Sequence, residues 1–117
     1  MLVAAEGLLR HHWPEVDHRV HLMVSGGPDS MALLALVGEF SKVVPRTVIV
    51  HHCHHGVAAE ADDWCSFVRS EAELRGFAFR VHHLNLSLGP DFEARARELR
   101  YKKIMSEVTS NEVVLTA

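Results

Sequence analysis

Several features are scarce in this sequence of 117 residues, and each absence excludes a class of protein. Its two cysteines, Cys53 and Cys65, are too few for a disulfide framework, so we expect two free thiols. No apolar run reaches the roughly 18 residues that a membrane-spanning helix needs. The first residues also lack the basic region and long apolar stretch of a signal peptide. These absences favour a cytoplasmic protein with no membrane partner.

Basic residues are also too few to indicate a strong nucleic-acid-binding surface. Lys and Arg number 12 against 15 Asp and Glu, which gives a formal net charge of -3. Binding to nucleic acid usually depends on clustered Lys and Arg that displace counterions from phosphates. Any contact with RNA is therefore expected to be local, or to lie outside these residues.

What the sequence does contain is an alternation of strand patterns and amphipathic helix patterns. The strand patterns cover residues 20–24, 47–52, 77–84 and 112–116. The helix patterns cover residues 4–12, 28–40, 59–75 and 91–108. This alternation predicts one α/β domain, a doubly wound, Rossmann-like parallel sheet with right-handed crossovers. Because the sequence stops at Ala117, directly after an apolar strand, we expect a partial domain that is truncated after the fourth strand.

The six residues between the first strand and the following helix are typical of a loop that binds pyrophosphate: Ser25, Gly26, Gly27, Pro28, Asp29 and Ser30. Glycines let backbone N–H groups approach phosphate oxygens, and a helix N-terminus presents further N–H groups and a partial positive charge. Pro28 suits the first turn of a helix, and the two serines can add hydroxyl donors. Asp29 is expected to bind Mg²⁺ or to cap the helix. The alternative is an ordinary turn rich in Ser and Gly.

The loop differs from the two commoner phosphate-binding motifs. It has neither a Gly-Lys-Ser/Thr ending nor the G-x-G-x-x-G spacing. Without a lysine that reaches the terminal phosphates, attack at the α-phosphorus with release of pyrophosphate is favoured over transfer of the γ-phosphoryl group.

Three segments resemble a known enzyme family. Residues 24–34, VSGGPDSMALL, resemble the SGGxDS signature of the PP-loop, or N-type, ATP pyrophosphatases. Residues 52–57, HCHHGV, with Asp62, and residues 93–101, EARARELRY, are similar to segments of tRNA(Ile)-lysidine synthetases. The resemblance implies the fold of the adenine-nucleotide alpha-hydrolases, with strand order 3-2-1-4 and ATP at the carboxyl ends of the first and fourth strands, where the order reverses. Residues 1–117 would then be part of an N-terminal PP-loop ATP-binding domain.

The resemblance also implies a reaction and its participants. A lysidine synthetase is an ATP-dependent ligase that adenylates the wobble cytidine of tRNA(Ile) and joins free lysine to it, releasing AMP and pyrophosphate. ATP and Mg²⁺ are the implied cofactors, with Asp29 as the catalytic and metal-binding residue. We expect His55 to line the adenosine pocket and Arg97 and Arg100 to contact phosphate or RNA. The family's later signatures would follow Ala117, so we expect these residues alone to be inactive on tRNA.

Two other functions stay open at this point. One is another PP-loop enzyme, either a tRNA thiolase or an amidotransferase-type synthetase, and the other is a non-catalytic nucleotide-binding module. Thiolating enzymes generally use paired cysteines, and Cys53 and Cys65 are too far apart for a C-x-x-C pair. The fourth strand, at 113–115, is expected to expose a sheet edge that favours self-association.

Several other residues have ordinary structural interpretations. The run His51 to His55 is not expected to form a zinc site, because adjacent residues of a strand point to opposite faces. His82 and His83 are expected on a strand with one side exposed, and Trp64 in the core. Surface ion pairs between Glu93 and Arg97, and between Glu98 and Lys102, are the structural alternative for the fourth helix.

Overall fold

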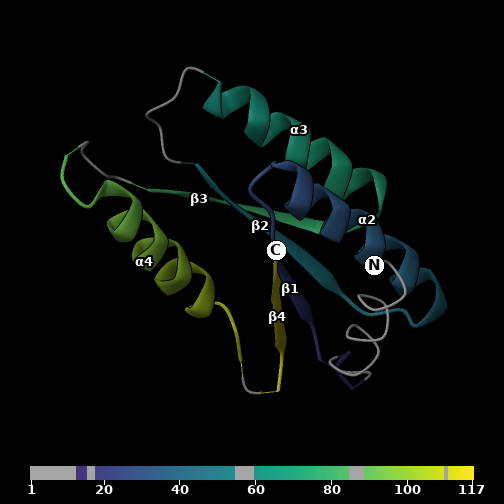
Figure 1. Ribbon diagram of the computed structural model, residues 1–117. Helices are drawn as coiled ribbons and strands as arrows, with labels where there is room; N and C mark the ends of the chain where they lie inside the picture. Colours follow the sequence, from purple (N-terminus) through teal and green to yellow (C-terminus); the bar gives the residue numbers. More distant parts are fainter. Residues whose placement is uncertain (1–12, 16–17, 55–59, 85–88, 110) are drawn as a thin grey trace.

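Four parallel strands form a single sheet at the centre of the molecule (Figure 1). The structure is a computed structural model that describes residues 13–15, 18–54, 60–84, 89–109 and 111–117. The strands lie in the order β3-β2-β1-β4, which confirms the predicted order 3-2-1-4. They are β1 (Val20–Met23), β2 (Val48–His54), β3 (Ala78–His83) and β4 (Val113–Thr116).

Helices cover both faces of this sheet, as expected for a doubly wound fold. They are α2 (Pro28–Val43), α3 (Ala61–Leu74) and α4 (Phe92–Met105). Figure 1 shows α2 and α3 on one face and α4 on the other. The helix predicted for residues 4–12 lies outside the described residues. None of the helices in the described ranges combines the length and the apolar character that a membrane span requires.

The apolar core lies between the sheet and the pair α2 and α3. Alternate residues of β1 and β2 point to this side, because successive strand residues face opposite ways. Fully buried side chains from both strands and both helices meet here: Val20, Leu22, Val48, Val50, Leu34, Val37, Val68 and Ala72. Burial of each large aliphatic side chain contributes about 1.5–3 kcal/mol, so this layer is the main source of stability.

The face toward α4 is different, because two of its central residues are histidines. His21 is fully buried and His51 is 1% exposed, and both alternate with the apolar core residues of their strands. Buried apolar residues on this side include Met23 of β1, Ile49 of β2, and Ala96 and Ile104 of α4. The sheet therefore has one dry apolar face and one face with a buried polar row.

Candidate functional site

The loop from Ser25 to Ser30 connects the end of β1 to the start of α2. Gly26 has φ +101°, a conformation that L side chains rarely adopt, so glycine is required there by the backbone itself. Gly27 caps α2 with φ -75° and ψ 170°, an ordinary extended geometry. The first bond of the helical ladder runs from the Met31 N–H to the Gly27 carbonyl at 3.0 Å. The N–H groups of Asp29 and Ser30 precede that ladder, which is the usual anion-binding position.

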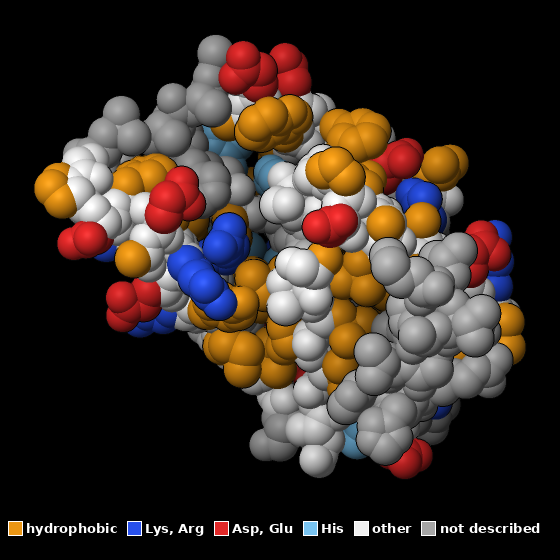
Figure 2. Space-filling model, viewed as in Figure 1, with side chains coloured by type: hydrophobic (Ala, Val, Ile, Leu, Met, Phe, Trp, Pro, Cys, Tyr) orange, Lys and Arg blue, Asp and Glu red, His pale blue; other side chains and the backbone are white. Residues whose placement is uncertain are grey.

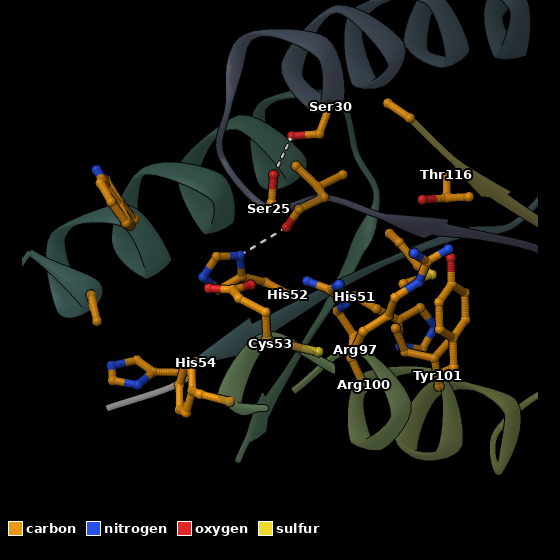
Figure 3. Close-up of a pocket in the computed structure, with 18 residues that line it drawn as sticks. Ser25, Ser30, His51, His52, Cys53, His54, Arg97, Arg100, Tyr101 and Thr116 are labelled. Atoms are coloured by element: carbon orange, nitrogen blue, oxygen red, sulfur yellow. Dashed lines mark hydrogen bonds between the residues drawn. The ribbon is translucent and has the colours of Figure 1, made fainter. Parts of the chain in front are cut away.

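The two serine hydroxyls hold the loop in this shape. Ser30 Oγ accepts a hydrogen bond from the Gly26 N–H and donates to the Gly27 carbonyl, both at 3.1 Å. Ser25 Oγ lies 3.1 Å from Ser30 Oγ and accepts a bond from the Gly27 N–H at 3.3 Å. Since the Ser30 proton is already used, Ser25 is the donor between the two hydroxyls. Figure 3 shows this contact; binding of phosphate by the hydroxyls stays a prediction.

Asp29 lies in the first turn of α2 rather than at its cap. The capping residue is Gly27 and no side chain caps this helix, so the proposed capping role of Asp29 is wrong. Its carboxylate is exposed, which leaves its oxygens accessible to a cation. Pro28 is the first residue of α2, as expected from its missing N–H.

His52 connects β2 to the start of the loop. Its Nδ1 lies 2.8 Å from the carbonyl oxygen of Val24, the residue directly before Ser25, and the ring is buried. The carbonyl accepts, so His52 Nδ1 carries the proton. This bond joins the carboxyl ends of β1 and β2 beneath the loop. His55, which was predicted to line the adenosine pocket, lies outside the described residues, and His52 was not predicted.

A pocket of about 570 Å³ opens at the carboxyl ends of the strands, within the usual range for small-molecule sites. Ser25 and Ser30 line it, whereas Gly26, Gly27, Pro28 and Asp29 are not among its lining residues. The strand β2 contributes consecutive residues from His51 to His54. Figure 2 shows Lys and Arg side chains on α4 beside a hollow in which histidine is visible.

The opposite wall of the pocket comes from α4. Arg97, Arg100 and Tyr101 all line it, and Figure 3 shows their side chains on the α4 side of the pocket, across from the serine pair. The Arg97 guanidinium lies 5.8 Å from the centre of the Tyr101 ring, a cation–π distance. Arg100 Nε is buried and has no hydrogen-bond partner among the residues that the structure describes. A buried donor of this kind favours an incoming acceptor such as a phosphate oxygen.

Neither of the ion pairs considered for α4 is found. Glu93 with Arg97 and Glu98 with Lys102 are absent from the ion pairs of the described part of the chain. Arg97 instead lies over the Tyr101 ring. The two arginines are thus available at the pocket, although their predicted contact with phosphate or RNA stays a prediction.

Two further residues complete the wall near β2. The Cys53 side chain lines the pocket, and burial raises the pKa of its thiol to about 11, so the thiol stays protonated at neutral pH. His54 Nε2 lies 2.6 Å from an oxygen of Asp62, which is itself exposed. Cys53 and Cys65 are both free thiols, as predicted.

Trp64 was predicted to be a core residue, and that prediction is wrong. It is 54% exposed and lines the pocket from the first turns of α3. The buried residues of α3 are the smaller Ala61, Val68 and Ala72. A tryptophan at the pocket rim presents a ring face that suits a planar base.

Comparison with known proteins gives one family match and a set of related enzymes. The profile of the PP-loop domain family matches residues 3–117. The tRNA(Ile)-lysidine synthase of Novosphingobium aromaticivorans is 39% identical over 102 residues, covering 86% of this chain and 30% of that protein. Those of Blochmanniella pennsylvanica and Haemophilus ducreyi are each 33% identical over 109 residues. These matches cover 21% and 24% of the two relatives, and 85% and 93% of this chain, respectively.

A solved structure with the same fold is the U34-tRNA thiolase NcsA from Methanococcus maripaludis, with its 4Fe-4S cluster. The TM-score is 0.67, and the match covers 87% of this chain and 40% of that one. At 18% sequence identity, this likeness establishes the fold alone. The chain spans less than a third of the length of the three curated relatives.

Proposed function

The chain belongs to the PP-loop domain family, and from that premise we propose that it is the ATP-binding part of a tRNA(Ile)-lysidine synthetase. In this proposal it binds ATP for adenylation of a tRNA base. The proposal includes the cytoplasm as the location, where tRNA, ATP and free lysine are all present.

One observation carries the proposal: the PP-loop segment and the two segments that resemble lysidine synthetases all contribute to one pocket. The first supplies Ser25 and Ser30, the second supplies His52, Cys53 and His54, and the third supplies Arg97, Arg100 and Tyr101. These segments are far apart in the sequence and belong to different elements. Their convergence at the carboxyl ends of parallel strands supports a nucleotide site at the position where doubly wound folds bind ligands.

The proposed chemistry requires positioning more than a protein nucleophile. The C2 carbonyl oxygen of cytidine attacks the α-phosphorus, and pyrophosphate leaves as the bond to the bridging oxygen breaks. The ε-amine of lysine then attacks C2, a C–N bond forms, AMP leaves and the amine loses a proton to solvent. The N–H groups of Asp29 and Ser30 and the Arg100 guanidinium are suited to hold the phosphates in line for the first step.

Asp29 fits the proposed role of magnesium ligand. It offers an exposed carboxylate in the first turn of α2, beside the N–H groups proposed to hold phosphate, and Mg²⁺ prefers oxygen ligands of this kind. A bound ion would neutralise charge on the phosphates. Asp29 itself would then orient the nucleotide without taking part in proton transfer.

The second candidate, tRNA thiolation, is less well supported by the chain's own residues. The thiol of Cys53 is buried and its raised pKa keeps it protonated, whereas sulfur transfer needs a thiolate. Cys65 lies on α3, and its thiol pKa is also raised by burial. A non-catalytic nucleotide-binding module remains the third candidate, which an activity assay separates from the first.

The first test is direct binding of ATP with magnesium to this chain by titration calorimetry. We expect a stoichiometry of one, and no heat with magnesium alone in the same range. Absence of ATP binding by the folded chain would contradict the nucleotide site itself.

The reaction is tested in a chimera that carries this chain in place of the matching segment of the Novosphingobium enzyme. We expect AMP release that depends on both lysine and tRNA(Ile). A folded chimera that binds ATP and releases no AMP would favour the non-catalytic alternative.

A further inference from the structure

A row of polar side chains crosses the α4 face of the sheet from one strand to the next. Glu112 Oε1 lies 2.9 Å from His21 Nε2, and His21 Nδ1 lies 2.8 Å from His51 Nε2. His51 Nδ1 in turn lies 2.9 Å from His82 Nε2, which lies 3.5 Å from Glu107 Oε2. The three rings come from β1, β2 and β3 and are stacked in sequence along the row.

One carboxylate fixes the direction of the hydrogen bonds in this row. Glu112 accepts hydrogen bonds from two nitrogens of Arg19, and these bonds hold the pKa of its carboxyl well below the usual range. It is therefore an acceptor only, so His21 in its neutral form donates from Nε2 and accepts at Nδ1. His51 must then donate from Nε2, and its Nδ1 lone pair points toward His82. The hydrogen bonds of the row therefore leave His51 Nδ1 unprotonated on the side that faces His82.

Three ligand atoms converge at that far end. One nitrogen each of His51 and His82 and one oxygen of Glu107 all lie within 4.8 Å of one another. In a tetrahedral zinc site with bonds of about 2.0–2.1 Å, ligand atoms are about 3.4 Å apart. The nitrogen atoms lie 2.9 Å apart, about 0.5 Å closer than this value, and the nitrogen and oxygen atoms lie 3.5 Å apart, within about 0.1 Å of it.

The surroundings leave this cluster accessible to solvent, and a proton shift from Nε2 to Nδ1 of His82 would free the second nitrogen ligand. The side chain of His82 is 9% exposed and that of Glu107 is 30% exposed, so the cluster opens to solvent on one side. Arg80 Nε contacts Glu107 Oε1 at 3.3 Å, which leaves Oε2 directed to His82.

We propose that His51, His82 and Glu107 form a site for Zn²⁺ or a similar late divalent transition metal ion, with a fourth position open to solvent. His21 and Glu112 support it from behind, because a metal-bound histidine usually donates its other N–H to a fixed acceptor. Arg80 and Lys103 act on His82 as nearby positive charges. Two of the three ligands are imidazole nitrogens, which suit late transition metal ions better than Mg²⁺. We therefore expect little binding of Mg²⁺.

A metal ion in this position would fasten α4 to the sheet. Glu107 follows α4 directly, whereas His51 and His82 belong to β2 and β3. The ion would therefore connect two strands to the segment between α4 and β4. His51 also lines the proposed nucleotide pocket, whereas the phosphate contacts are proposed at the loop from Ser25 to Ser30.

The test is Zn²⁺ binding to this chain, measured by competition with a chromophoric chelator, together with the visible absorption of the Co²⁺ form. We expect one tight site and a Co²⁺ spectrum typical of four- or five-coordinate nitrogen and oxygen ligation. His82→Gln and Glu107→Gln should each weaken Zn²⁺ binding about 100-fold or more, since loss of an outer-shell partner alone costs about 10–100-fold.

Matched controls distinguish this site from ordinary surface binding by the other histidines. His83→Gln removes a neighbouring exposed histidine from the same strand, and Glu98→Gln removes an exposed carboxylate from α4. Both controls should bind Zn²⁺ as the parent does. Equal weakening by His82→Gln and His83→Gln would overturn the proposal.

A second measurement covers the case in which a variant fails to fold. Zn²⁺ in excess should raise the melting temperature of the parent chain, because a ligand that binds only the folded state stabilises it. Mg²⁺ at the same concentration should not. A parent chain whose melting temperature is unchanged by Zn²⁺ would also overturn the proposal.

Discussion

Replacement of Gly27 by alanine distinguishes the effect of this position on protein stability from its effect on ATP binding. Gly27 has φ -75° and ψ 170°, which any residue can adopt. A Cβ atom built there would meet only Ser25 Oγ, at 3.6 Å, an ordinary van der Waals distance. The free energy of unfolding should therefore change by less than about 0.5 kcal/mol, or rise by about 0.4–1 kcal/mol through loss of entropy in the unfolded chain.

ATP binding should respond very differently to the same substitution. The added methyl group lies at the entrance to α2, where phosphate oxygens must come within about 3 Å of backbone N–H groups. Loss of one charge-assisted hydrogen bond costs about 1.5–3 kcal/mol. That range corresponds to a dissociation constant about ten- to a hundredfold weaker. Titration calorimetry with ATP and magnesium measures this change.

Gly26→Ala is the matched comparison within the loop. At φ +101° alanine is strained by about 1–3 kcal/mol, so this variant should lose stability as well as binding. Thermal denaturation of both variants separates the two effects. If Gly27→Ala binds ATP as tightly as the parent chain, the phosphate does not approach this part of the backbone and the assignment of the loop is wrong.

Three other predictions concern the pocket walls and the sheet edge. Arg100→Ala should weaken ATP binding at least about tenfold by removing a charged donor, whereas Lys102→Ala on the exposed face of the same helix should leave calorimetric affinity unchanged. His52→Leu should lower the unfolding free energy by about 1–3 kcal/mol in thermal denaturation, because it leaves a buried carbonyl without a donor. His54→Leu, whose partner is exposed, should cost less than about 1 kcal/mol. The β4 edge at 113–115 should cause self-association that rises with concentration in sedimentation; a monodisperse monomer would contradict this.

The parallel sheet and the position of the phosphate loop were predictable because each rests on local patterns, whereas the strand order 3-2-1-4 was implied by the family resemblance. The run from Val20 to Val24, ended by Ser25 and two glycines, identifies a buried strand that reaches its carboxyl end at a loop. Alternation of strands and helices then requires crossovers of one hand. The boundaries differ by a few residues, as for α4, which ends at Met105 rather than at 108.

Contacts across strands were not predictable in this way. Period-two alternation predicts that His51 and Cys53 share a face of β2, but it says nothing about the residues of β1 and β3 beside them. The row of His21, His51 and His82 depends on sheet register, which no local pattern encodes. The residues of one strand therefore could not indicate this cluster, whose members come from β2, β3 and the segment after α4.

Trp64 shows a second limit of the sequence patterns. A large aromatic at helical spacing is usually buried, because its apolar area is large. In α3 the buried positions hold small residues, and Trp64 lies at the rim of the pocket. Its position depends on how far α3 extends past the ends of the strands, which is a property of the assembled fold.

The parallel sheet also has a consequence for the order of folding. The pairing of β1 with β2 joins Val20 to Val48, whereas the pairing of β1 with β4 joins Val20 to Val113. The ion pair between Arg19 and Glu112 closes a loop of 93 residues. Closure of longer loops costs more entropy before any contact is gained. We expect β1, β2 and β3 to assemble first and β4 to dock last, so the α4 wall of the pocket would be fixed only in the final step of folding.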